Sequence, residues 1–304
     1  MRTSLSLPIF SLFIFLFVVS PAWCDQEVPI RVLNYENGTT IDYSVALLCG
    51  ELTDHSLDQV VATNLDSSSS TKRLEGLALD GRFKVLCELQ RGDNRIRLKA
   101  GDDAIELTLR FEPNENPRFV RVIYMTARDG ESAFQTPIED DPQDYRGKLA
   151  TAMKLMQTMT AERMHDLGYG RTTFNLELDE EGKVLVHDYE GELTTEEYWA
   201  LADGTWWQRL YREVGREYSM QQARNLIIPA YTRYNSETCK TDGHTALGGG
   251  GQALFGSGNL FTWPNSLADA QPAFMDSTVI DTDNFMSDSV GRDCHWGAPS
   301  TTMG

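Results

Sequence analysis

Hydrophobic and polar residues alternate along residues 26–112, in short runs that are rich in Val, Ile, Leu and Phe. Turn signals separate these runs at Asn37-Gly38, Gly92-Asp93 and Gly101-Asp102. Short strands at this spacing, with no helical period between them, predict a β-sandwich of immunoglobulin type. His55 is the only histidine of this region and lies in a polar stretch, so we interpret the region as a structural or recognition module.

The hydrophobic period changes after a short linker. "RFEPNENPRF" at residues 110–119 has two prolines and a polar centre, which marks a boundary between a domain at 25–114 and a second domain at 115–304. "RFVRVIYMTA" then predicts a strand. Residues 140–170 predict a long helix, capped by Asp141 with Pro142 in its first position. Its apolar positions recur at helical spacing, at Leu149, Ala152, Met153, Met156, Met159 and Met164. Methionines can bind copper, but this spacing predicts that they pack in the core.

The rest of the second domain mixes strand and helix patterns. Residues 171–191 predict a hairpin that turns at Glu181-Gly182, and Thr194 with Glu197 forms a capping box that starts another helix. "ARNLIIPAYTRY" at 223–234 predicts a strand, and a glycine-rich segment follows at 242–264. This order predicts helices packed on a sheet. We therefore expect an α+β chain of two domains, an immunoglobulin-like β-sandwich followed by an α/β domain.

The N-terminus has the pattern of a secretory signal peptide. Arg2 is followed by the apolar stretch "LSLPIFSLFIFLFVVSPAWC", and Ala22 and Cys24 suit the positions before a cleavage at Asp25. The run is short and interrupted by Pro21, which disfavours a membrane anchor. We expect residues 1–24 to be removed and the protein to be secreted, or periplasmic in a bacterium. The net charge of −18 disfavours nucleic-acid partners and anionic membranes.

An oxidising destination makes the cysteines candidates for disulfides. After cleavage four remain, which allow three pairings. Sequence separation favours Cys49 with Cys87 and Cys239 with Cys294, one pair in each domain, and four buried free thiols are the alternative. Asn37 begins the sequon "NGT" in a turn-like context, which predicts glycosylation in a eukaryotic host.

Patterns for catalysis or metal binding are absent from the sequence. It has no G-x-S-x-G, no phosphate-binding glycine loop and no H-E-x-x-H. The acidic stretch around Asp281 and Asp283 fails as a calcium loop, because Phe285 stands where a third oxygen ligand is required. The remaining histidines are His165, His187, His244 and His295, and we interpret each of them as structural. We therefore predict no catalytic, cofactor-binding or metal-ligating residue in this sequence.

Three stretches carry a resemblance to a known family: "KLMQTMTAERMHDLGYGRTTFNL", "HTALGGGGQALFGSGNLFTWP" and "GRDCHWGAPSTTMG". In these the chain resembles the zinc metallopeptidase family named Metallopep. The resemblance covers nearly all of the chain after the signal peptide. It implies a β-rich domain followed by a zincin-like domain, and hydrolysis of a peptide or protein substrate by zinc-activated water.

The resemblance also implies where the zinc would be held. In the family, a segment like "GAPSTTMG" leads into a helix that carries H-E-x-x-H, and this sequence has no such helix. We therefore expect residues 115–304 to be a zincin-like domain without its active-site helix. Such a fragment would be inactive on its own and would hold no zinc. The resemblance implies that the edge of the substrate cleft is formed by Gly248, Gly249, Gly250 and Gly251.

A second interpretation belongs to a different functional class. A secreted, non-catalytic binding protein could reuse the same sandwich and protease scaffold. A third interpretation is carbohydrate recognition by the sandwich, but the sequence shows no clear set of aromatic residues on which a sugar could stack. An in-frame H-E-x-x-H downstream of codon 304 would distinguish the first interpretation from the second.

Overall fold

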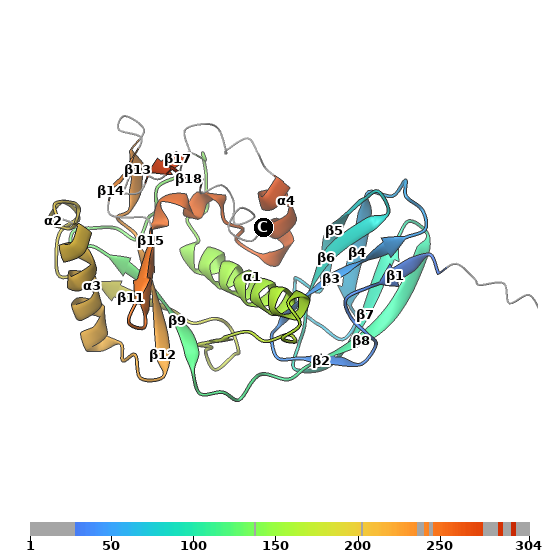
Figure 1. Ribbon diagram of the computed structural model, residues 1–304. Coiled ribbons are helices and arrows are strands. Elements are labelled where there is room, and N and C mark those ends of the chain that lie inside the picture. Colours follow the sequence, from blue (N-terminus) through green and yellow to red (C-terminus); the bar gives the residue numbers. More distant parts are fainter. Residues whose placement is uncertain are drawn as a thin grey trace, which may run out of the picture.

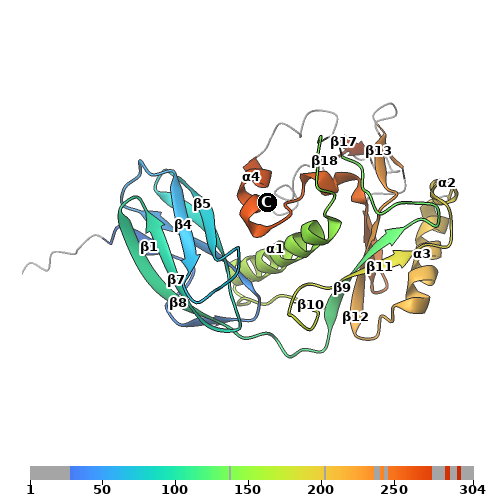
Figure 2. The same ribbon diagram turned by 180° about the vertical axis from the view of Figure 1, so that it is seen from behind.

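The protein is described here by a computed structural model, which places residues 28–136, 138–201, 203–235, 240–242, 246–275, 285–287 and 293–295. The predicted signal peptide, Cys239 and His244 lie outside these ranges, and the side chains of Cys294 and His295 are not among those described. Along the molecule, Figures 1 and 2 show a first sheet, helix α1 (Tyr145–Asp166), a second sheet and helix α3 (Asp203–Glu217). None of the helices in these ranges combines the length and the apolar composition that a transmembrane span requires.

The first sheet contains eight strands in the order β1-β3-β6-β5-β4-β7-β8-β2. All neighbours are antiparallel except β2 and β8, which are parallel. The strands are β1 (Ile30–Val32), β2 (Thr39–Ile41), β3 (Val45–Leu52), β4 (Gln59–Asn64), β5 (Arg73–Leu79), β6 (Arg82–Glu88), β7 (Gly92–Ala100) and β8 (Asp103–Phe111).

This sheet corrects the predicted architecture of the N-terminal region. The strands are present as expected, but they form one continuous curled sheet instead of the two stacked sheets of an immunoglobulin sandwich. Curling brings β1 near β8, so a single sheet encloses its own apolar face, with Val60, Ile96 and Leu98 fully buried. A two-residue side-chain period is the same in a sandwich and in a curled sheet, so the sequence pattern does not distinguish them.

The second sheet is mostly parallel. Strand β9 (Phe119–Thr126) pairs with β12 (Ala223–Pro229) on one side and with both β10 (Asn175–Leu176) and β11 (Val186–Glu190) on the other. Beyond β12 lie β16 (Gln252–Phe255) and the antiparallel β15 (Ala246–Gly249). The predicted hairpin is correct only at its tip, where Leu178 bridges Val184 and the chain turns at Gly182. The strands that flank the tip instead run parallel to β9.

Helices cover both faces of the second sheet, as the predicted layer architecture requires. Val122 and Tyr124 of β9 pack with Leu149 of α1 on one face. The alternate residues Ile123 and Met125 pack on the other face with side chains of α3 and of α2 (Thr195–Trp199). The capping box of Thr194 and Glu197 is confirmed at the start of α2.

The remaining elements are η1 (Ser257–Thr262), η2 (Leu267–Asp269), α4 (Ala270–Met275), β13 (Arg233–Asn235), β14 (Lys240–Asp242), β17 (Phe285–Ser287) and β18 (Asp293–His295).

Helix α1 lies between the two sheets and is buried on two sides. Leu149 and Met153 pack on the second sheet, whereas Leu155 contacts Val45 and Leu74 of the first. The single apolar face predicted from the sequence is therefore wrong, and Met156 on that predicted face is 41% exposed. A helix that is packed on two sides shows no single apolar stripe.

The C-terminal half of α1 attaches the first sheet through one partly buried carboxylate, that of Glu162. Tyr43 OH donates to Glu162 Oε1 at 2.9 Å and Asn34 Nδ2 donates to Oε2 at 3.1 Å, with Tyr35 OH as a further donor. Arg171 Nε donates to Oε1 at 2.9 Å, and its guanidinium lies 4.0 Å from the centre of the Tyr35 ring. Burial alone would raise the pKa of Glu162, but the hydrogen bonds from Arg171 and Tyr35 outweigh it and lower the pKa.

The predicted Cys49–Cys87 disulfide is absent from the structure, in which both thiols are free. In the register of β3 and β6, Cys49 lies opposite Lys84, and Cys87 lies opposite Ala46. The two cysteines are thus three positions apart along the strands, about 10 Å, and their side chains point to opposite faces. A disulfide requires Cα atoms within about 7 Å. Burial raises the pKa of Cys87 to about 12. The Cys239–Cys294 pairing lies outside the described residues.

Replacing Glu162 with Gln should destabilise the folded protein. The change leaves the partly buried Arg171 guanidinium without its counter-charge, which we expect to cost about 1–3 kcal/mol of unfolding free energy at neutral pH. Urea unfolding of Glu162→Gln against wild type measures this. Glu180→Gln is the control, because Glu180 is exposed.

The same variant should change the pH dependence of stability. A carboxyl whose pKa is lowered by folding contributes stability above its usual value of 4.5, and this contribution is lost as pH falls through the folded pKa. The stability difference between wild type and Glu162→Gln should therefore shrink below about pH 4.5. A difference that is constant from pH 7 to 3 would contradict this account.

Candidate functional site

The four glycines proposed for the substrate cleft lie together in a hairpin at the edge of the second sheet. Gly248 and Gly249 belong to β15, which among the described residues pairs only with β16. Gly250 and Gly251 form the turn with φ values of 58° and 97°, the conformation of a type I′ turn that glycine adopts without strain. The outer side of β15 is therefore an edge of exposed backbone, because Gly248 and Gly249 are both exposed.

The register of the hairpin determines which backbone groups face outward. Gly249 lies opposite Gln252 across the two-residue turn, which makes this the hydrogen-bonded closing pair. The next residue, Gly248, then directs its N–H and C=O away from β16. Tyr211 of α3 fixes the turn, since its hydroxyl donates to Gly250 O at 3.0 Å and its carbonyl accepts from Gln252 Nε2 at 3.0 Å.

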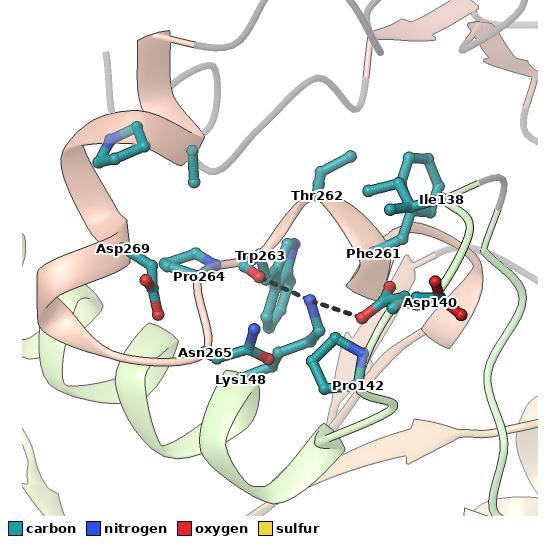
Figure 3. Close-up of a pocket in the computed structure, with 13 residues that line it drawn as sticks. Ile138, Asp140, Pro142, Lys148, Phe261, Thr262, Trp263, Pro264, Asn265 and Asp269 are labelled. Atoms are coloured by element: carbon teal, nitrogen blue, oxygen red, sulfur yellow. Dashed lines mark hydrogen bonds and ion pairs between the residues drawn. The ribbon is translucent and has the colours of Figure 1, made fainter.

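A second feature, which the sequence analysis does not predict, is a cavity at the start of α1. We call it the α1 pocket. It has a volume of about 340 Å³ and is drawn in Figure 3. Its lining comes from the loop before α1, the first turn of α1, the end of η1, the loop after it, η2 and α4. The residues are Ile138, Asp140, Asp141, Pro142, Lys148, Phe261, Thr262, Trp263, Pro264, Asn265, Asp269, Pro272 and Ala273.

A buried ion pair lies in the α1 pocket. Lys148 Nζ and the carboxylate of Asp141 are 3.6 Å apart, and each side chain is 3% exposed. Lys148 Nζ donates to Trp263 O at 2.9 Å (Figure 3). It also lies 5.6 Å from the centre of the Phe134 ring. Burial lowers the pKa of Lys148, and the opposing attraction of Asp141 does not compensate. The carboxylate of Asp141 lacks hydrogen bonds, because neither its Oδ1 nor its Oδ2 has a hydrogen-bond partner.

The sequence assigned Asp141 a different role. It was expected to cap α1, but Asp144 is the N-cap and accepts from Gly147 N at 2.9 Å. Asp141 and Asp144 both lie just before the helical pattern, and Pro142 favoured Asp141 as the cap because proline is common in the first helical position. Tertiary contact with Lys148 places Asp141 in the cavity instead. The one sequence signal for the pocket was Lys148 itself, a charged residue next to Leu149 at the start of an apolar stripe.

The histidines with described side chains do not assemble into a metal site. His187 Nε2 lies 2.8 Å from Glu177 Oε2, which also receives Arg121 Nε at 2.7 Å. Burial raises the pKa of Glu177, but the bonds from Arg121 and His187 prevail and lower it. His165 is exposed at the end of α1. Within the described part of the chain, no three His, Cys, Asp or Glu residues lie close enough to hold a metal ion.

The predicted glycosylation position is accessible. Asn37 is exposed in the turn between β1 and β2, and its Oδ1 accepts from Thr108 N at 2.6 Å.

Comparison with known proteins decides the family. The family model of Metallopep, described as "Putative peptidase family", matches residues 29–304. The chain belongs to this family. It is also 25% identical over 219 residues to a protein of Schizosaccharomyces pombe named "Putative zinc metalloproteinase", a match that covers 65% of this chain and 36% of that protein. The chain thus spans about a third of the length of this relative.

Solved structures are less similar to this Metallopep chain. Wild-type OgpA of Akkermansia muciniphila is 21% identical, covers 40% of this chain and 32% of that one, and has a TM-score of 0.31. Domains 4 and 5 of the S-layer protein SbsC give 16% identity, coverage of 27% and 50%, and a TM-score of 0.20. At these TM-scores neither likeness supports an argument about fold or function.

Proposed function

We propose that this chain forms the scaffold and part of the substrate-binding edge of a secreted zinc metallopeptidase. Membership of the Metallopep family over residues 29–304 is the observation that carries the proposal. The name of the Schizosaccharomyces pombe relative supports the zinc and peptidase assignments. Because the chain spans about a third of that relative, the activity and substrate of the whole protein belong to the proposal.

The edge strand supports a peptide substrate. An extended peptide can add to an exposed strand through main-chain hydrogen bonds, and Gly248 offers an N–H and a C=O on the outer side of β15. A glycine at this position leaves room for a second backbone, since the nearest atom to a methyl group placed on its Cα would be Gln252 O at 3.9 Å. Gly248–Gly251 is the segment that family resemblance assigns to the cleft wall.

The described residues do not fit a zinc ion, and we derive no catalytic step through one. No group of three potential ligands is present among them, and the sequence lacks H-E-x-x-H. In such peptidases zinc activates the attacking water. In this proposal the ligands and the general base come from the family's zinc helix, outside these 304 residues.

A second candidate is a secreted binding protein that captures extended peptides without cleaving them. The exposed edge of β15, together with the lack of a metal-ligating pattern in the sequence, favours it. It differs from the first candidate in predicting peptide binding with no hydrolysis under any metal condition.

The transcript and a metal assay distinguish the two candidates. The peptidase proposal predicts in-frame codons for H-E-x-x-H after codon 304, one bound zinc per chain of the complete product, and loss of casein hydrolysis after chelation. Residues 1–304 alone should contain substoichiometric zinc and leave casein intact. A stop codon at position 305 on the native transcript would sink the peptidase proposal and favour the binding protein.

The role of the glycine edge is tested at Gly248. Gly248→Pro removes the outward N–H and should weaken binding of fluorescein-labelled casein by about tenfold, since main-chain bonds are lost. Gly248→Ala keeps the N–H and should bind within about twofold of wild type, because its methyl group meets only ordinary contacts. Equal binding by both variants would refute the edge-strand role. Gly250 is unsuitable for this test, since any side chain there meets Tyr211 at 3.0 Å.

Secretion is tested on the protein recovered from its own host. Its N-terminus should be Asp25, and in a eukaryotic host an N-glycosidase should reduce the mass of the peptide that contains Asn37. A mature protein that retains Met1 would contradict the secretion proposal.

A further inference from the structure

The α1 pocket contains a carboxylate that the fold leaves without hydrogen-bond donors. Asp141 is 3% exposed, and both of its oxygens lack a partner within the described structure. A carboxylate has about four acceptor sites, and burying it without donors is costly. At 3.6 Å, Lys148 Nζ is beyond the roughly 2.7–2.9 Å of a charge-assisted hydrogen bond. The pocket therefore has acceptor capacity that its own side chains do not use.

Lys148 does not supply the missing donor because its position is fixed by other contacts. Its Nζ donates to Trp263 O at 2.9 Å, and its ammonium group packs against the ring of Phe134. A second acceptor shares the cavity, since Asn265 Oδ1 is buried and has no hydrogen-bond partner. The unmet requirement in the pocket is thus for donors.

The charged residues around the cavity indicate the charge that a ligand should carry. Asp140, Asp141 and Asp269 line it, and Asp144 adds to the field at Lys148, so four carboxylates surround one ammonium. Asp269 is partly committed, because its Oδ2 accepts from Ser266 N and Oγ. The excess negative charge favours a cation.

The side chains that line the cavity indicate which kind of cation it would bind. A small divalent metal would need several oxygen ligands, and no cluster of three ligating side chains exists among the described residues. The half-buried ring of Trp263, with Phe261 and Pro264 beside it, instead gives an apolar and aromatic lining (Figure 3). Aromatic rings attract guanidinium and ammonium groups, and a guanidinium brings five donors in a planar fork.

We propose that the α1 pocket binds a guanidinium or primary ammonium group, which donates to Asp141 and Asn265 and packs against Trp263. The group can belong to a free small molecule or to a basic side chain of a peptide. The volume of about 340 Å³ suits either, and Asp140 at the exposed rim leaves the cavity open to solvent. This site is independent of the peptidase proposal, because none of its residues lies on β15.

The test compares two ligands of the same shape on the unaltered chain. Calorimetric titration with Nα-acetyl-L-arginine amide should show saturable binding. Nα-acetyl-L-citrulline amide, which is neutral, should bind at least about tenfold more weakly because it loses the charge-assisted bonds. Agmatine and the peptide Gly-Gly-Arg-Gly-Gly amide then identify the source: tighter binding of the peptide indicates a peptide side chain, and tighter binding of agmatine indicates a small molecule.

A variant pair localises the binding. Asp141→Asn keeps the shape and removes the charge, so the affinity for arginine amide should fall by about tenfold or more, to the level of citrulline amide. Asp102→Asn removes an exposed carboxylate in the first sheet and should leave the affinity unchanged. Thermal melts verify that both variants fold. Equal affinity of wild type for the two ligands, no binding of arginine amide up to about 10 mM, or unchanged affinity in Asp141→Asn would each overturn the proposal.

Discussion

The desolvation of α1 on two sides is the constraint on which the arrangement of the other elements depends. A helix between two sheets must satisfy polar groups that a surface helix would leave to water. Thr158 Oγ1 donates to Val45 O at 2.7 Å in the first sheet, and Gln157 Nε2 donates to Phe174 O at 2.7 Å next to the second. These bonds fix the helix relative to both sheets, since shifting it would leave buried donors unpaired.

The two ends of α1 differ in how completely their buried charges are satisfied. Glu162 near the C-terminal end receives bonds from four side chains, and the result is a junction between the first sheet and the helix. Asp141, beside the N-terminal end, receives none. Both carboxylates are largely removed from water, so the same physical argument assigns them different roles. The hydrogen-bonded carboxylate holds the structure together, whereas the carboxylate without hydrogen bonds, which lines a cavity, is suited to a ligand.

The sequence predicted the element types better than their partners. Apolar spacing located α1 and the strand alternation of residues 26–112, because these patterns are local. It did not reveal that Leu155 faces the first sheet, since two-sided burial removes the single stripe. Cys49 and Cys87 show the same limit: sequence separation suggested a pair, but strand register places them on opposite faces. The pocket was missed because the partner of Asp141 is seven residues further on, across a helix start that the sequence located wrongly.

The glycine edge and one wall of the α1 pocket belong to one continuous segment. The chain leaves the hairpin at Phe255 and reaches the pocket at Phe261, and the rings of Phe255 and Trp263 lie 5.4 Å apart. Between them Ser257 Oγ, which is fully buried, donates to Ala230 O at 2.9 Å just beyond the end of β12. This bond anchors the segment to the central strand. Because the segment that carries Asn265 and Trp263 is thereby held in place before any ligand arrives, a cation that fits this wall would lose little free energy to ordering it.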